Sequence, residues 1–219
     1  MKPYIIKIFI FTALLLVTPL FANAHQPRII TGSETVNIEN PEISQAFYGV
    51  MTGEPANFQI VSEEPFRLYA GVLVPDIEEI DKDVSAEIIS LEDPKIKILL
   101  DGSTHEWERF HEEFANDWYF NGPEMEETEV PAGTYNIRVF SNDNQGKYVL
   151  VVGKIESFPL DEIINTIITL PELKKDFFNK SPLTAYFNLV GLFMLIIFVV
   201  GLIIIALLYF LIKKLYFKK

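Results

Sequence analysis

The run from Leu183 to Ile212 carries no charged side chain, and a cluster of lysines follows it at once. The hydrocarbon core of a bilayer is about 30 Å thick, and a helix of about 20 apolar residues crosses it. A helix in the core of a soluble domain is the alternative, but such a helix normally keeps a polar face and this run has none. The sequence therefore predicts one transmembrane helix over residues 183–212 and a short basic tail over residues 213–219.

A second apolar run, at the N-terminus, has a different character. Lys2 and Lys7 lie at its start, and the small-residue triplet at positions 22–24 lies at its end. This order of basic, apolar and small residues is typical of a secretory signal peptide. We therefore predict that residues 1–24 are a signal peptide and that cleavage leaves His25 as the mature N-terminus. An uncleaved N-terminal anchor is the alternative.

The two apolar segments together predict an orientation. The lysines at positions 213, 214, 218 and 219 favour the cytoplasmic side of the membrane. Lys174, Lys175 and Lys180 lie on the outer flank and oppose this rule mildly, but a cleaved signal peptide sets the orientation. We expect a type I single-pass protein of the plasma (cytoplasmic) membrane, from a bacterial source, with its N-terminal domain extracytoplasmic.

Charge is concentrated in the part of the chain that precedes the membrane span. All 30 acidic residues and 12 of the 18 basic residues lie between the predicted signal peptide and the span, which gives residues 25–182 a net charge of −18. So acidic a surface repels the phosphates of nucleic acid, so nucleic-acid binding is excluded. The acidity has two readings: it keeps the domain soluble beside an anionic membrane, or its acidic loops hold calcium.

Short runs of alternating apolar and polar residues fill the middle of the chain. In residues 134–140, for example, Tyr135, Ile137 and Val139 fall on one face of a strand. Turns rich in proline, glycine and aspartate separate these runs, which is typical of an all-β domain. We predict a mainly β ectodomain, an antiparallel β-sandwich of jelly-roll type, over residues 25–155.

The segment before the membrane span has helical periodicity instead. Leu160, Ile163, Ile164, Ile167 and Ile168 follow the i, i+3, i+4, i+7, i+8 spacing of one helix face. We predict a juxtamembrane amphipathic helical stalk over residues 156–182. Two placements are open: the helix packs under the sandwich, or it lies on the outer leaflet together with Phe177 and Phe178.

Two segments of the β region carry a family resemblance. Residues 130–139, which begin Val-Pro-Ala-Gly-Thr-Tyr, and the Tyr-containing strand of residues 146–152 resemble the last hairpin of bacterial pre-peptidase C-terminal (PPC) domains. Residues 46–49 and 57–60 are similar to the opening hairpin of those domains. The resemblance spans residues 45–152. It implies a jelly-roll-like sandwich that serves as an accessory or binding module, in some members with structural calcium.

The sequence offers few groups for catalysis. It has no cysteine, which excludes thiol chemistry and Cys-ligated metal sites. It also lacks a nucleophile elbow, a P-loop and a kinase signature. The acidic doublets are adjacent residues, whose side chains point apart on a strand, so they do not form acid–base pairs. We therefore expect no enzymatic activity and no obligatory cofactor.

Three histidines are the candidate metal ligands. A mature N-terminal His25 offers a free amine and an imidazole, a pair that chelates copper when one further histidine completes the site. His105 and His111 are the available partners, and their separation on a strand, about 20 Å, allows at most one of them to join His25. The alternative is an incidental terminal histidine beside a solvated polar segment.

These observations predict a membrane-anchored, non-catalytic binding or structural module, held in the lipid bilayer by residues 183–212. A protein partner at the cell surface is the expected ligand, and aromatic residues around Trp107 and Trp118 are candidate contacts. A copper- or calcium-binding protein is the alternative function.

Overall fold

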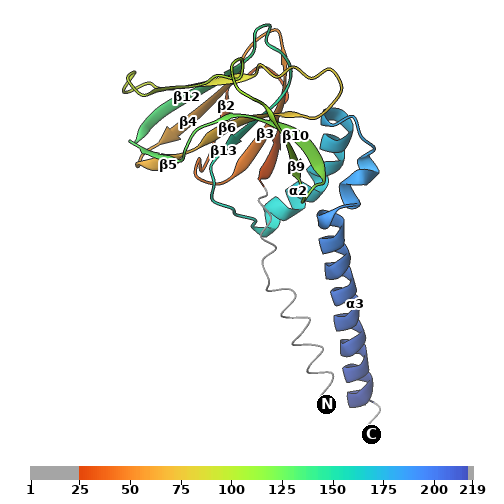
Figure 1. Ribbon diagram of the computed structural model, residues 1–219. Helices are drawn as coiled ribbons and strands as arrows, with labels where there is room; N and C mark the ends of the chain where they lie inside the picture. Colours follow the sequence, from red (N-terminus) through yellow and green to blue (C-terminus); the bar gives the residue numbers. More distant parts are fainter. Residues whose placement is uncertain (1–24, 217–219) are drawn as a thin grey trace.

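The computed structural model describes residues 25–216, and these form two facing β-sheets, a helical layer and one long helix that leaves the domain (Figure 1). The prediction of a signal peptide over residues 1–24 lies outside the described residues, as does the end of the tail. The six-stranded sheet has the order β1 (Gln26–Ile29), β3 (Gln45–Thr52), β13 (Gln145–Val152), β6 (Ala70–Pro75), β10 (Asp117–Glu124) and β9 (Glu108–Glu112). The five-stranded sheet has the order β2 (Val36–Asn37), β4 (Ala56–Ser62), β12 (Gly133–Phe140), β7 (Ser85–Ser90) and β8 (Lys97–Leu100). A small pair, β5 (Phe66–Leu68) with β11 (Thr128–Val130), lies beside them.

The core lies between the two sheets, because alternate residues of each strand turn inward. Tyr135, Ile137 and Val139 of β12 are completely buried, as their alternation predicts. Phe47 of β3 meets Phe58 of β4 across the core at 5.4 Å between ring centroids, with the rings edge to face. The prediction of a mainly β, sandwich-like fold is therefore confirmed.

At one edge of each sheet, the outermost strand pairs in parallel rather than antiparallel. β1 pairs with β3 in parallel, and β2 pairs with β4 in parallel. Parallel neighbours need a crossover connection, and the chain supplies it by visiting the opposite sheet: β2 lies between β1 and β3 in the sequence. The other pairings within the two sheets are antiparallel.

Neither of the two regions that resemble PPC hairpins forms a hairpin. β3 and β4 lie in different sheets, and so do β12 and β13. β12 instead hydrogen-bonds β4 and β7, while β13 hydrogen-bonds β3 and β6. The hairpin expectation is wrong here because alternation indicates which face of a strand is buried but not which sheet the strand joins.

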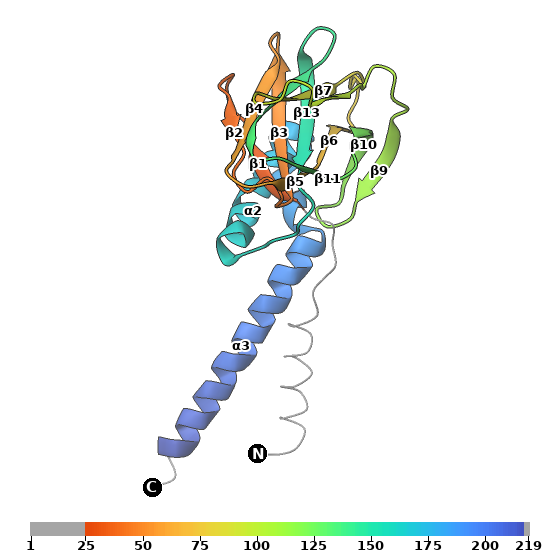
Figure 2. The same cartoon turned by 90° about the vertical axis from the view of Figure 1, so that its left-hand side faces the viewer.

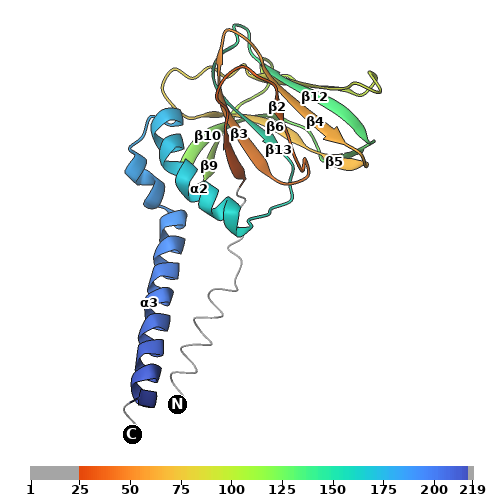
Figure 3. The ribbon, with the colours of Figure 1, turned by 180° about the vertical axis from the view of Figure 1, so that it is seen from behind.

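A helical layer covers the outer face of the six-stranded sheet, and it follows the last strand directly (Figure 3). It consists of α2 (Leu160–Glu172), a π-helical turn η1 (Leu173–Phe177) and a 3-10 turn η2 (Pro182–Tyr186). Phe177 and Phe178 lie edge to face against Tyr48 and Tyr119 of the sheet, at 5.1 and 5.3 Å between centroids. Both phenylalanines are buried, so at these residues the stalk packs under the sandwich rather than on lipid.

A buried cluster of charges fastens this layer to the sheet. Lys174 of η1 and Asp117 of β10 are ion-paired at 2.6 Å, and their side chains are only 1% and 2% exposed. Lys180 donates to the other carboxylate oxygen of Asp117 at 2.8 Å. Lys174 also donates to the carbonyl of Ala115 at 2.5 Å, as does Asn188 at 2.9 Å. Burial lowers the pKa of Lys174, and its hydrogen bond to Asp117 opposes that shift.

The long helix α3 (Leu189–Tyr216) extends away from the end of the domain that carries α2 (Figure 2). Its segment Leu189–Lys214 is long and apolar enough to cross a membrane, with a mean hydropathy of 3.3 and no buried residues in the apolar window. The helix begins six residues after the start of the charge-free run, because the first residues of that run pack against the domain. Ala185 is completely buried, and Tyr186 donates its hydroxyl to the carbonyl of Ile167 at 3.3 Å.

The buried ion pair gives a prediction for stability. Lys174→Met removes a cation whose partner Asp117 then remains buried with only Lys180 beside it, and breaking a buried pair in this way costs about 3–5 kcal/mol. Lys175→Met is the matched control, because its side chain is 66% exposed and its ion pair with Asp176 lies at the surface. We expect that control to change the free energy of unfolding by less than about 0.5 kcal/mol.

The measurement is chemical unfolding of the full chain in detergent micelles, followed by tryptophan fluorescence. Equal unfolding midpoints for the two variants would contradict the structural role of the buried pair.

Candidate ligand-binding groove

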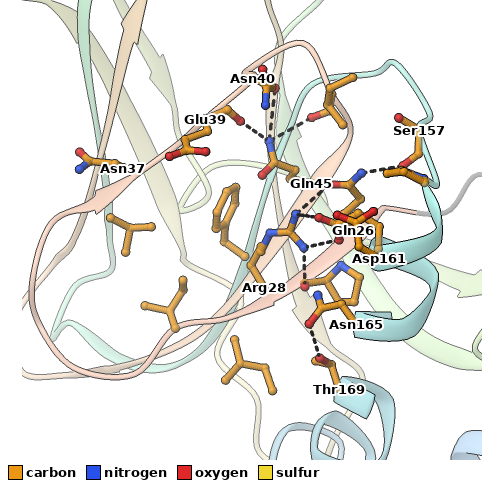
Figure 4. A pocket seen from close by; sticks show the side chains of 18 of the residues that line it. Gln26, Arg28, Asn37, Glu39, Asn40, Gln45, Ser157, Asp161, Asn165 and Thr169 are labelled. Carbon is orange, nitrogen blue, oxygen red and sulfur yellow. Dashed lines mark hydrogen bonds and ion pairs between the residues drawn. The ribbon is translucent and has the colours of Figure 1, made fainter. Parts of the chain in front are cut away.

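A polar groove of about 710 Å³ opens between the edge strands of the sandwich and α2 (Figure 4). One wall is formed by β1, β2 and the loop that leads into β3, and the other by the polar side of α2. The side chains that line it are mostly amides and acids: Gln26, Arg28, Asn37, Glu39, Asn40, Gln45, Asp161, Glu162, Asn165, Thr169 and Glu172. Such a lining suits a ligand that is held by hydrogen bonds and charge.

The strand edge in this groove is poorly suited to receiving another strand. Pro27 in the middle of β1 has no backbone N–H to donate. The Arg28 guanidinium donates to the Pro27 carbonyl at 3.2 Å, which occupies the acceptor beside it. β2 offers only two residues. A ligand in this groove therefore has to be recognised through side chains rather than through strand addition.

Arg28 of β1 links the two walls of the groove through an ion pair with α2. Its guanidinium donates to both carboxylate oxygens of Glu162 on α2, at 2.8 and 2.7 Å, in the bidentate geometry that makes such pairs strong. It also donates to the side-chain oxygen of Gln26 at 2.8 Å, and Gln26 donates to the Ser157 carbonyl at 2.6 Å. The side chains of Arg28 and Glu162 are 27% and 19% exposed. The one positive charge of the groove is thus already paired within the protein.

Three carboxylates of the groove remain without a basic partner. Glu39, Asp161 and Glu172 are exposed, and no lysine or arginine in the part of the chain that the structure describes forms an ion pair with them. Asn37 and Asn165 add amide donors and acceptors to the lining. Clefts lined by one sign of charge concentrate counter-ions. The arrangement therefore favours a cationic group that also makes hydrogen bonds.

The three histidines proposed as metal ligands do not gather at this groove. His25 and His105 both line a second groove, of about 600 Å³, whose walls include residues of β6, β9 and β10. The Nδ1 atom of His25 is hydrogen-bonded to the Ser44 hydroxyl. His111 lies elsewhere: its ring stacks on Trp118 at 4.4 Å, and its Nε2 is 2.8 Å from the Asn116 side-chain oxygen. Of the two pairings that the sequence left open, the structure brings His25 toward His105.

Within residues 25–216, no group of three or more His, Asp or Glu side chains is arranged to hold a metal ion. The copper and calcium hypotheses both stay predictions.

The aromatic residues near Trp118 differ in exposure. Tyr119 is buried beneath the helical layer, whereas Trp118 is 37% exposed with the Arg109 guanidinium 4.1 Å from its ring centre.

No motif or periodicity in the sequence predicts the groove. Asp161 and Glu162 are acidic residues in the first turn of a helix, a position that the helix dipole alone explains. Arg28 lies in a strand of four residues, too short for a clear alternation. The only signal was the isolation of Arg28, the one basic residue between positions 25 and 66.

Comparison with known proteins gives a fold likeness only. No protein-family model matches the chain, and no curated protein sequence matches it. Among solved structures, the pre-peptidase C-terminal domain of a collagenase from Bacillus anthracis is similar at 9% identity and a TM-score of 0.34, over 56% of this chain and 97% of that chain. PliG, a periplasmic inhibitor of g-type lysozyme from Salmonella Typhimurium, is similar at 15% identity and a TM-score of 0.33, over 56% of this chain and 98% of that chain. The weak resemblance to PPC domains is thereby confirmed, and at these scores it identifies no activity.

The placement of the histidines makes the copper hypothesis testable. If His25 chelates Cu(II) through its amine and imidazole, His105→Ala and a one-residue N-terminal extension should each weaken binding by at least about tenfold, since each removes a ligand. His111→Ala should leave the affinity unchanged. Copper titration followed by EPR checks this in the protein that begins at His25. Equal affinity in all four proteins, or no binding in any, would exclude the hypothesis.

Proposed function

We propose that this protein is a single-pass membrane-anchored binding module without catalytic activity, whose extracytoplasmic β-sandwich recognises a cationic segment of a protein partner at the cell surface. The ligand site in this proposal is the groove between β1, β2 and α2. The proposal has two parts, the anchor and the ligand class, and each is supported by separate observations.

The anchor rests on α3 and on what precedes it. The apolar stretch of α3 has no polar face, and Lys213 and Lys214 lie in the last turn of the same helix. The stalk that leads into it is fixed to the sheet through Asp117, so the domain and the helix are joined without a loose linker. This supports a domain held close to the bilayer, on the side opposite the basic tail.

The ligand class rests on the unpaired carboxylates of the groove, which is the observation that carries the proposal. Arg28 is paired with Glu162, so the unpaired negative charge of the groove that faces solvent comes from Glu39, Asp161 and Glu172. The net charge of −18 before the span adds a long-range field of the same sign. Lysine or arginine side chains of a partner complement these carboxylates and the neighbouring amides.

Copper binding is the second candidate function, and one observation supports it: His25 and His105 line the same groove. The hydrogen bond between His25 Nδ1 and Ser44 has to be released before that nitrogen can bind a metal. The binding-module proposal requires no such rearrangement, so we place it first.

A charge-matched pair of variants tests the ligand class. The groove variant carries Glu39→Gln, Asp161→Asn and Glu172→Gln; the control carries Glu54→Gln, Glu63→Gln and Glu64→Gln, three exposed acids that do not line the groove. The probe is a lysine–glycine peptide, titrated at 0.15 M salt against the full chain in nanodiscs of zwitterionic lipid. Three ion pairs of modest strength amount to about 1–2 kcal/mol, so the groove variant should bind about tenfold more weakly.

The control variant loses the same formal charge and should bind within about twofold of the unmodified protein, because its acids act only through the screened field. An equal loss in both variants would show that the peptide responds to net charge alone, and this would contradict a specific groove.

The orientation is tested by cysteine labelling, which the chain allows because it has no cysteine of its own. Val61→Cys on β4 is 66% exposed, and Tyr216→Cys at the end of α3 is 79% exposed. In intact bacterial cells whose outer membrane has been made permeable, a membrane-impermeant maleimide should label Val61→Cys. It should label Tyr216→Cys only after the inner membrane is opened. The reverse pattern would contradict the orientation.

A further inference from the structure

The face of α2 that points away from the sheet is apolar and uncovered. Leu160, Ile164 and Ile168 are 73%, 50% and 70% exposed. Residues four apart lie one above the other on a helix, so the three side chains form one continuous strip. On the opposite side of α2, Thr166 and Leu170 are buried against the domain. The apolar arc of α2 is therefore wider than the part that the sheet covers.

Two further apolar side chains are bare in the segment that connects α2 to α3. Leu183 is 68% exposed and Phe187 is 79% exposed. Phe187 lies two residues before the start of α3. Uncovered apolar side chains thus continue along the chain from α2 to the membrane span, whereas soluble proteins rarely leave apolar patches of this kind uncovered.

Contacts between α2 and α3 set the height of the strip relative to the bilayer. Val190 and Met194, in the first two turns of α3, pack in one cluster with Ile167 and Leu170 of α2. Figures 1 and 3 show α2 inclined to α3, with its first turn nearest the level at which α3 starts and its last turn farther from the C-terminal end of α3. The first turn of α2, which carries the start of the strip, therefore lies near the level at which α3 begins.

The length of the span places that level in the lipid interface. The 26 residues of Leu189–Lys214 extend about 39 Å at 1.5 Å per residue. This exceeds the hydrocarbon core by about 9 Å, so the ends of the span lie among the headgroups. The turns of α3 that touch α2 are at the outer end. The first turns of α2 thus lie where an exposed apolar helix face can reach the lipid interface.

We propose that Leu160 and Ile164, at the start of this strip, insert into the outer leaflet, so that the first turns of α2 are a second membrane contact. This inference rests on the anchoring role proposed for α3. α2 carries no lysine or arginine, so its attraction to lipid is apolar and does not require anionic headgroups. Of the two placements that the sequence left open, α2 uses both: one face packs under the sandwich and the other rests on lipid.

The contact has a consequence for the ligand groove. Glu162, Asn165 and Thr169, on a third side of α2, line that groove. A helix whose first turns contact the bilayer therefore holds the groove near the membrane surface. A ligand that reaches it belongs to a partner in the same membrane or to a segment that lies close to the headgroups.

Depth-dependent fluorescence quenching tests the inference on the full chain in phosphatidylcholine vesicles. Single cysteines at Ile164, Val61 and Ile204 carry an environment-sensitive fluorophore, and the vesicles contain lipids with nitroxides near the headgroup or deep in the acyl chain. The label at Ile164 should lie about 5–10 Å below the headgroup surface. The shallow nitroxide should quench it at least about threefold more than it quenches Val61→Cys, which is on the exposed face of β4.

Ile204→Cys, in the middle of α3, separates failure of the inference from failure of the anchor. Quenching of Ile204→Cys by the deep nitroxide, with Ile164→Cys no more quenched than Val61→Cys, would overturn the inference and leave the anchor intact. Absence of quenching at Ile204→Cys would overturn the anchor and the inference with it. An Ile164 label that is shielded from water but not quenched by lipid would indicate a protein contact and would also overturn the inference.

Discussion

The buried carboxylate of Asp117 is the constraint on which the arrangement of this protein depends. It lies on β10, at the end of the six-stranded sheet nearest the helices, and accepts hydrogen bonds from Lys174 and Lys180, 57 and 63 residues further along the chain. A buried carboxylate without these partners would be strongly unfavourable, so the helical layer and the sheet hold each other in place. Asn188, the residue before α3, donates a hydrogen bond to the carbonyl of Ala115, two residues before Asp117. The candidate membrane span α3 therefore continues a fixed structure and is not attached through a flexible linker.

With this junction fixed, α2 acquires three distinct sides. Leu170 faces the sheet, Glu162 faces the ligand groove, where it pairs with Arg28, and Ile164 faces outward. The three sides differ accordingly: apolar against the domain, charged in the groove, and apolar on the outward side for which we propose the lipid contact. One helix of 13 residues thereby adjoins the β domain and the groove and carries the proposed membrane contact.

The sequence predicted the regular parts of the fold and missed the contacts between distant segments. β12 occupies residues 133–140, within one residue of the run whose alternation indicates a strand, and α2 begins at Leu160, as its periodicity indicates. The sequence did not predict β1 and β2, because strands of four and two residues are too short to show a period. Alternation also does not reveal that β12 and β13 belong to opposite sheets, since that choice is made by long-range packing.

Lys174 shows most clearly why the junction could not be predicted. In the sequence it reads as a positive charge on the outer flank of the membrane span, in mild conflict with the positive-inside rule. In the structure it and Lys180 both pair with Asp117, whose single negative charge offsets one of the two positive charges, so the conflict is reduced. The groove was missed for the same reason: the pair between Arg28 and Glu162 joins residues 134 positions apart, and no local pattern reports such a contact.

A distance measurement between the β domain and the membrane helix tests the fixed junction most directly. Spin labels at Val61→Cys on β4 and Leu192→Cys in the first turn of α3, both exposed, report that distance by pulsed EPR on the full chain in nanodiscs. The account predicts one narrow distance distribution, which broadens when Asp117 is replaced by alanine. A broad distribution in the otherwise unmodified protein would mean that the domain moves freely on its anchor, and would contradict the account.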